Sequence, residues 1–91
     1  MAEQTILIAE DDPDIRDGVR ILLSGEGYHI IEAENGTRAL EVFRPEVDLV
    51  ILDIMMPGMS GLRVCEELRK LSTVPILFLT AKSQESDKLL G

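Results

Sequence analysis

The sequence is poor in several residue types on which common protein functions depend. Cys65 is the single cysteine, so no disulfide can form within the chain, and a reducing cytoplasm fits this composition. His29 is the single histidine and falls within a predicted strand, so no Ser-His-Asp catalytic set can be built around it. Neither G-x-G-x-x-G nor G-x-x-x-x-G-K follows the first apolar run, which excludes the usual nucleotide-binding loops.

Long apolar runs and positive charge are also scarce. Runs such as residues 49–52 are far too short to span a membrane, and the N-terminus lacks the pattern of a signal peptide. The chain has 9 basic and 17 acidic residues, a net charge of −8, so its surface repels the phosphates of nucleic acids. We therefore expect a cytoplasmic protein that contacts neither membrane nor nucleic acid. Its 91 residues leave room for one domain.

Strand-like and helix-like patterns alternate along the whole chain. The predicted strands cover residues 5–9, 28–33, 48–53 and 75–80, and the apolar run of the first and third is typical of strands buried on both faces. Between the strands, apolar residues recur at helical spacing: Ile15, Val19, Leu22 and Leu23; then Ala39, Leu40 and Phe43 after a cap at Thr37; then Leu62, Cys65, Leu68 and Leu71. Residues 85–91 resemble the start of a fourth helix. This order predicts an α/β fold, a doubly wound parallel sheet with helices on both faces.

Acidic side chains stand where these strands end. Glu10, Asp11 and Asp12 follow the first strand, Asp53 closes the third, and the hydroxyl of Thr80 closes the fourth. Doubly wound sheets bind their ligands beyond the carboxyl ends of the strands, so these side chains should share one rim. Carboxylates held together repel one another unless a cation neutralises them, and Mg²⁺ prefers such oxygen ligands. The rim therefore predicts a Mg²⁺ site whose best nucleophile is an aspartate.

Each of these residues also has a simpler explanation. Asp11 or Asp12, standing before Pro13, could be the N-cap of the following helix. Asp53 could be an ordinary acid at the end of a strand, and Thr80 a β-branched strand residue or a cap. Their joint placement on successive strand ends favours the functional interpretation.

Three segments resemble the signature stretches of response-regulator receiver domains: I-L-I-A-E-D-D-P-D-I-R, D-L-V-I-L-D-I-M-M-P-G-M-S-G and V-P-I-L-F-L-T-A-K. The resemblance runs from the first strand to the last residue and implies a flavodoxin-like fold. Glu10-Asp11 and the final E-S-D-K-L-L-G look most like the OmpR/PhoB subfamily of transcription factors. The resemblance therefore implies a two-component signalling protein that switches an output, namely DNA binding by a C-terminal domain outside these 91 residues.

The resemblance also implies a role for each residue of the rim. Asp53 is the phosphoacceptor, and a sensor histidine kinase is the donor. Asp11 and Asp53 bind Mg²⁺ directly together with the backbone carbonyl of Met55, and Glu10 acts through water. Asp12 stands where many relatives carry a further acid, and its role stays open. Thr80 is the switch hydroxyl that binds the phosphoryl group, and Ala81 is the small neighbour that leaves access to it. Pro57 and Gly61 shape the loop after the acceptor.

Receiver domains of this kind continue beyond the length seen here, with a fifth strand, a phosphate-binding lysine and a fifth helix. We therefore expect residues 1–91 to be a single receiver domain that is incomplete at its C-terminus, without the fifth strand and fifth helix. Lys82 and Lys88 stand in the wrong place for that lysine. The fourth strand would then lie at an edge of the sheet, which predicts self-association through that edge or by exchange of elements.

Two other functions remain open at this point. An aspartate-nucleophile phosphohydrolase also places Asp at a strand end with Mg²⁺, but it usually carries a second Asp two residues later, where this chain has Met55. A folded but inert fragment is the other alternative. Steady turnover of a phosphate ester would support the first, and failure to bind Mg²⁺ would support the second.

Overall fold

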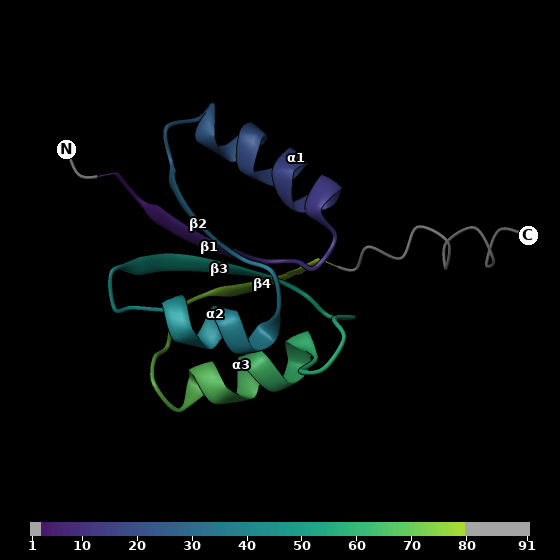
Figure 1. The fold of residues 1–91 in the computed structure, drawn as a ribbon. Coiled ribbons are helices and arrows are strands. Elements are labelled where there is room, and N and C mark those ends of the chain that lie inside the picture. Colours follow the sequence, from purple (N-terminus) through teal and green to yellow (C-terminus); the bar gives the residue numbers. More distant parts are fainter. Residues whose placement is uncertain (1–2, 80–91) are drawn as a thin grey trace, which may run out of the picture.

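Within residues 3–79, which a computed structural model describes, strands and helices alternate as the sequence predicts (Figure 1). The strands are β1 (Thr5–Ala9), β2 (His29–Ala33), β3 (Val47–Asp53) and β4 (Ile76–Leu79), and the helices are α1 (Pro13–Ser24), α2 (Gly36–Val42) and α3 (Gly61–Arg69). All strand pairs are parallel, and the order across the sheet is β2-β1-β3-β4. Helix α1 covers one face, and α2 and α3 cover the other. The predicted fold class, a doubly wound parallel α/β sheet, is confirmed.

The central strand β1 is apolar throughout because helices cover both of its faces. Ile6 and Ile8 belong to a buried cluster with Ile51 on the side of α1, whereas Leu7 and Ala9 belong to the larger cluster under α2 and α3. Burying one aliphatic side chain of this size contributes about 1.5–3 kcal/mol, so alternate residues of one short strand stabilise two layers at once.

The start of α1 follows the sequence prediction, but the start of α2 does not. Pro13 occupies the first turn of α1 behind the cap Asp12, where its missing N–H costs nothing. In α2 the cap is Asn35 and not Thr37 as predicted, because the Arg38 N–H donates to Asn35 Oδ1 at 2.7 Å. Asn35 has an extended backbone from which a short side chain reaches the free donors of the first turn, whereas Thr37 already lies inside the helix.

The buried face of α3 agrees with the prediction in part, because Leu68 is buried and Cys65 packs against the core as predicted. Gly61, Val64 and Leu68 face the core, whereas Leu62 and Leu71 are exposed. Gly61 approaches the end of β3 so closely that it sets the rotation of the helix, and Leu71 lies beyond the helix end. The prediction followed the larger apolar side chains and overlooked the glycine, so it was wrong at Leu62 and Leu71.

Two smaller differences concern α1 and β2. Leu22 is exposed, although Val19 and Leu23 pack against the sheet as predicted. His29 is the first residue of β2 and not a residue within the strand, and it is exposed at the end of the sheet opposite to the acids. His29 therefore lies away from the acidic rim, as the sequence predicted.

The end of the chain limits what can be compared with the sequence. Strand β4 is observed over Ile76–Leu79, whereas Thr80 and Ala81 and the predicted helix over 85–91 lie outside the described residues. Among residues 3–79, no helix combines the length and the apolar character that crossing a bilayer requires.

Candidate metal and phosphoacceptor site

Two neighbouring strands bring two acids together at one rim of the sheet. In the parallel pairing of β1 with β3, Ala9 lies opposite Leu52, so Glu10 and Asp53 are the next residues on each side. Adjacent strands are about 4.8 Å apart, and both backbones therefore place their carboxylates within reach of one ion. The predicted convergence of these acids follows from the strand register.

Glu10 is buried, with 1% of its surface exposed. Its N–H donates to the Ala33 carbonyl at 3.1 Å, which continues the pairing of β1 with β2 by one residue. Its Oε2 accepts from the Asp12 N–H at 3.0 Å, but its buried Oε1 has no hydrogen-bond partner. A buried acceptor without a partner costs about 1–3 kcal/mol, and more when it is charged.

Burial raises the pKa of Glu10 from 4.5 to about 7, and the neighbouring acids Asp53 and Asp11 add to the rise. The hydrogen bond from the Asp12 N–H acts in the opposite direction, because it favours the ionised carboxylate. The rim thus concentrates more negative charge than the protein neutralises with its own cations.

Asp53 is also buried, with 3% of its surface exposed. Its Oδ1 accepts from the Met55 N–H at 3.1 Å, so the carboxylate is held by the loop that follows its own strand. That loop turns at Gly58, whose φ of 80° is a conformation that favours glycine, and it ends at the cap Ser60. The Gly61 N–H then donates to the Ile54 carbonyl at 3.0 Å, which closes the loop against the strand end.

Glu10, Asp11 and Asp53 each offer a carboxylate oxygen, and these oxygens all lie within 4.8 Å of one another. Asp11 is exposed, so the cluster opens to solvent on its side. Oxygen ligands alone suit Mg²⁺ or Ca²⁺ and not the softer metals. The unpartnered oxygen of Glu10 is an independent sign that a cation fits here.

Asp12 does something different from its two neighbours. Its Oδ1 accepts from the Asp14 N–H at 2.9 Å and from the Ile15 N–H at 3.4 Å, which makes it the N-cap of α1. The simpler of its two sequence interpretations therefore describes its contacts. Of the acids that follow β1, Glu10 and Asp11 are the ones that join Asp53 in the carboxylate cluster.

The sequence analysis missed one neighbour of the cluster, Arg16. Its Nη1 donates to the backbone carbonyl of Glu10 at 2.7 Å, and it lies in α1 one turn after the cap. The only sign of this in the sequence is that Arg16 stands four positions after the N-cap Asp12. Residues at this spacing lie on the same face of a helix, so Arg16 lies near the end of β1.

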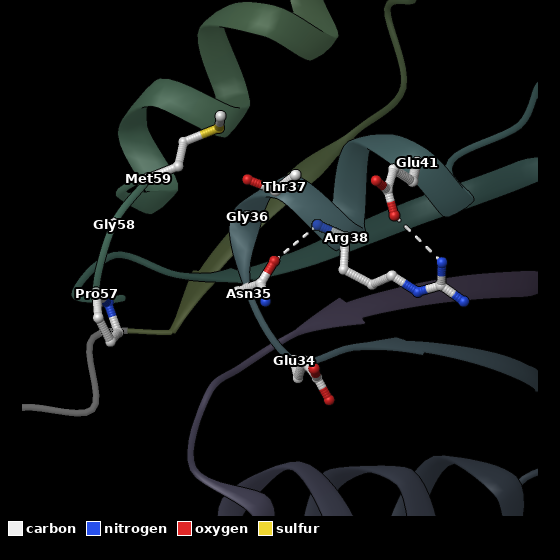
Figure 2. A pocket seen from close by; sticks show the side chains of 9 residues that line it. All are labelled: Glu34, Asn35, Gly36, Thr37, Arg38, Glu41, Pro57, Gly58 and Met59. Atoms are coloured by element: carbon white, nitrogen blue, oxygen red, sulfur yellow. Dashed lines mark hydrogen bonds and ion pairs between the residues drawn. The ribbon is translucent and has the colours of Figure 1, made fainter.

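A hollow of about 470 Å³ lies beside the rim, between the start of α2 and the loop that follows β3 (Figure 2). Glu34 to Arg38 line one side and Pro57 to Met59 the other. None of the clustered acids lines it, and the Arg38 guanidinium is engaged by Glu41 at 3.2 Å. We therefore assign the chemistry to the carboxylate cluster and not to this hollow.

Replacing Glu10 by glutamine should stabilise the metal-free chain by about 1–3 kcal/mol. Glutamine keeps an oxygen for the Asp12 N–H and turns an NH₂ donor toward the other carboxylates, so the unpartnered acceptor disappears. Urea unfolding with a chelator present measures the effect. The matched control is Glu26→Gln, which removes the same charge from an exposed turn and should change stability by less than about 0.5 kcal/mol. Equal midpoints for the two variants would contradict this assignment.

The family described as "Response regulator receiver domain" matches residues 6–90 of the chain. The chain is similar to the "Uncharacterized transcriptional regulatory protein YrkP" of Bacillus subtilis, with 52% identity over 94% of this chain and 37% of the relative. It thus spans little more than a third of the length of that relative.

Solved structures give the same result. The chain is similar to the response regulator TrrA of Thermotoga maritima, solved in complex with Mg²⁺-BeF: the TM-score is 0.81 and the identity 46%, over 94% of this chain and 76% of TrrA. It is also similar to the response regulator in the complex of histidine kinase ThkA with TrrA, with a TM-score of 0.78 and 49% identity over 86% of this chain and 69% of that one.

Proposed function

The chain belongs to the response regulator receiver domain family, and on that premise we propose that it accepts a phosphoryl group on Asp53 in a Mg²⁺-dependent reaction. The observation that carries this proposal is the carboxylate cluster, in which buried Asp53 stands with Glu10 and Asp11 at the ends of two paired strands. Among relatives that resemble this chain are transcriptional regulators of the OmpR type, as the sequence predicted. The assignment of residues 1–91 to one domain stays a prediction.

Each residue of the rim would have its own role in Mg²⁺ binding and phosphoryl transfer. Asp11 and Asp53 would hold Mg²⁺ directly with the backbone carbonyl of Met55, and the unpartnered oxygen of Glu10 would take part through water. When bound, the ion supplies positive charge that offsets the charge on the phosphoryl oxygens. The Met55 N–H donates to Asp53 Oδ1 and so restricts the orientation of this carboxylate, which would favour in-line attack on the phosphoryl group. In the transfer, one Asp53 oxygen forms a bond to phosphorus while the bond from phosphorus to the donor breaks.

We propose a phosphohistidine of a sensor kinase as the physiological donor. The similar regulator TrrA is solved in complex with a histidine kinase, which supports this class of partner. Because Asp53 is almost fully covered, the donor has to enter over the exposed Asp11 side of the cluster. Nothing in the charge pattern favours a nucleic acid as a direct partner of this segment, and DNA binding would belong to a separate output domain.

Thr80 and Ala81 keep their proposed roles, as switch hydroxyl and as small neighbour, although both lie outside the described residues. Asp53 pairs with Leu79, the last residue of β4, which supports the idea that the residue following it in the sequence reaches the phosphoryl group. Movement of that hydroxyl toward the acyl phosphate would transmit the added charge to the surface of the domain.

Phosphate incorporation tests the proposal against its rivals. A receiver takes up one phosphate per chain and then stops, apart from slow hydrolysis, and needs Mg²⁺ to do so. A phosphohydrolase releases phosphate continuously from an ester substrate, and an inert fragment does neither. The family is one of signalling regulators, and we propose that its own phosphorylation is the only reaction this segment promotes.

We also propose that the 91-residue chain associates with a second copy through β4, by edge pairing or exchange of elements. Among residues 3–79 no strand pairs with the outer edge of β4, and Leu77 is exposed there. An apolar groove of about 300 Å³, whose lining includes Ile51, Leu49 and Leu77, lies on the α1 side of the same strands. An apolar, β-prone strand with an open edge is a template for another chain.

Sedimentation of the 91-residue chain at increasing concentration should therefore reveal dimers or larger species. A Leu77→Lys variant should sediment closer to a monomer, because a charge on an edge strand disfavours pairing. A wild-type chain that stays monomeric and unfolds cooperatively would show that this edge is protected in another way.

A further inference from the structure

Arg16 is a largely buried cation next to the proposed metal site, and nothing in the reaction so far uses it. Its side chain is 18% exposed, although it starts from the first half of a helix that has no fully buried residue. The guanidinium lies between two acceptors. Nη1 donates to the Glu10 carbonyl at 2.7 Å, and Nε donates to Glu32 Oε1 at 3.2 Å.

Glu32 connects two arginines of α1 to β2. It lies on β2 opposite Ile8 of β1, and its second oxygen, Oε2, is 3.4 Å from Nε of Arg20. Arg20 is one helical turn further along α1 and contacts Asp17 as well, but the described hydrogen bonds connect it to no atom of Glu10. The two arginines thus share one carboxylate, and Arg16 alone continues to the rim.

We propose that Arg16 is a positioning residue for the metal site, acting through the Glu10 carbonyl. This inference rests on the proposed Mg²⁺ site. The peptide unit is planar, so holding the Glu10 carbonyl oxygen also fixes the N and Cα of Asp11. A short charge-assisted bond to that oxygen therefore orients both acids that the β1–α1 connection contributes to the cluster.

A purely structural role makes a different prediction. If Arg16 only fastened α1 to β2 through Glu32, Arg20 would be equivalent to it, because both arginines contact the same carboxylate and carry the same charge. Loss of either would then change the stability of the fold and the electrostatic field at the rim in similar ways. The contact that distinguishes them is the one from Arg16 to Glu10.

The experiment is a titration with Mg²⁺ alone on the 91-residue chain and its variants. Arg16→Ala should weaken Mg²⁺ binding about tenfold, the lower end of the range for partners that orient metal ligands. Arg20→Ala, the matched control, should stay within about twofold of the wild type, because a partly exposed charge one turn away is well screened. Arg16→Lys keeps the charge without the planar fork and should fall between the two.

A second readout needs no metal. With a chelator present, hydrogen exchange at the Asp12 amide should speed up about tenfold in Arg16→Ala and remain unchanged in Arg20→Ala. The Asp12 amide is a suitable probe because it donates to Glu10 Oε2. If Arg16→Ala proves too unstable, Arg16→Lys carries both measurements, since it retains the cation between α1 and β2.

Asp11→Asn separates failure of this inference from failure of the proposed function. If Asp11→Asn abolishes Mg²⁺ binding while Arg16→Ala behaves like Arg20→Ala, the positioning role is wrong and the site stands. If Asp11→Asn binds Mg²⁺ as the wild type does, the site itself is wrong and the inference falls with it.

Discussion

Replacing Asp53 by asparagine should abolish phosphate uptake, lowering its rate by at least about a hundredfold. In a regulator of the relatives' length that carries residues 1–91 at its N-terminus, acetyl phosphate should transfer one phosphoryl group. The bond from phosphorus to the acetyl oxygen breaks, acetate leaves, and an Asp53 oxygen forms the new acyl phosphate. The side-chain amide of the variant is a poor nucleophile and a neutral metal ligand. The variant therefore loses both the group that attacks phosphorus and a charged ligand for Mg²⁺. Mass measurement of the intact chain, before and after mild base, detects the acid-stable and base-labile product.

Asp12→Asn is the matched control for this experiment. Asparagine caps a helix about as well as aspartate, so the contacts of Asp12 with the Asp14 and Ile15 amides should persist. If Asp12 serves only as a helix cap, the Asp12→Asn variant should take up phosphate at a rate within about threefold of the wild type. A loss comparable to that of Asp53→Asn would instead place Asp12 among the functional acids.

The site of labelling decides the mechanism. Recovery of the phosphate on Ser60 or Thr80, or its survival in base, would exclude an aspartyl phosphate. The same phosphorylation experiment can be carried out on the 91-residue chain by itself. We expect it to be phosphorylated poorly, because no lysine among its residues stands where receiver domains bind the phosphoryl group.

Gly61→Ala should lower the free energy of unfolding by about 3 kcal/mol or more, a large part of the stability of a small domain. A Cβ at Gly61 would overlap the Asp53 carbonyl oxygen and come within 2.9 Å of the Ile54 Cα. Both groups are backbone, so neither can rotate away as a flexible side chain would. Relief requires α3 or the end of β3 to move, and that movement displaces the acceptor itself.

Urea unfolding and Mg²⁺ titration together measure the effect of Gly61→Ala. The matched control is Gly18→Ala, because Gly18 is an exposed residue of α1 with nothing within 4 Å of its added Cβ. That variant should be more stable than the wild type by about 0.5–1 kcal/mol, the usual gain for alanine in a helix. If Gly61→Ala lost no stability, the close approach of α3 to β3 would be wrong.

Sequence reasoning succeeded where one physical effect dominates. The uninterrupted apolar run of residues 5–9 has few explanations other than a strand covered on both faces, and it is the central strand. The acids at strand ends were predicted to converge, because parallel strands share one rim, and Glu10, Asp11 and Asp53 do so.

It failed where two residues compete for the same task. Asn35 and Thr37 are both good caps, and the choice depends on which backbone is extended, which the sequence does not reveal. In α3 the prediction weighed the size of Leu62 and Leu71, whereas the fit of Gly61 against β3 determined the buried face. A glycine that packs closely against a strand adds no apolar side chain to the pattern, so the hydrophobic periodicity does not reveal it.

Glu10 illustrates the same limit within the site. The family resemblance assigned Glu10 a contact with the metal through water, and the neighbouring residues in the sequence did not indicate that its side chain is buried. The structure buries its carboxylate and leaves one oxygen without a donor, which follows from the extra backbone bond that continues β1 beyond Ala9. Burial of this kind depends on tertiary packing and strand pairing and not on the local sequence pattern.

The strand order also has a consequence for the synthesis of the protein. Of the four described strands, β1 leaves the ribosome first, and it lies between β2 and β3 in the finished sheet. Thr5 donates to Asp48, which is 43 positions later in the chain. At ribosomal speeds that separation corresponds to about 2 to 9 s, during which the nascent β1 has one of its two neighbours at most. Its apolar residues are therefore exposed to chaperones and to other nascent chains for seconds in every round of translation.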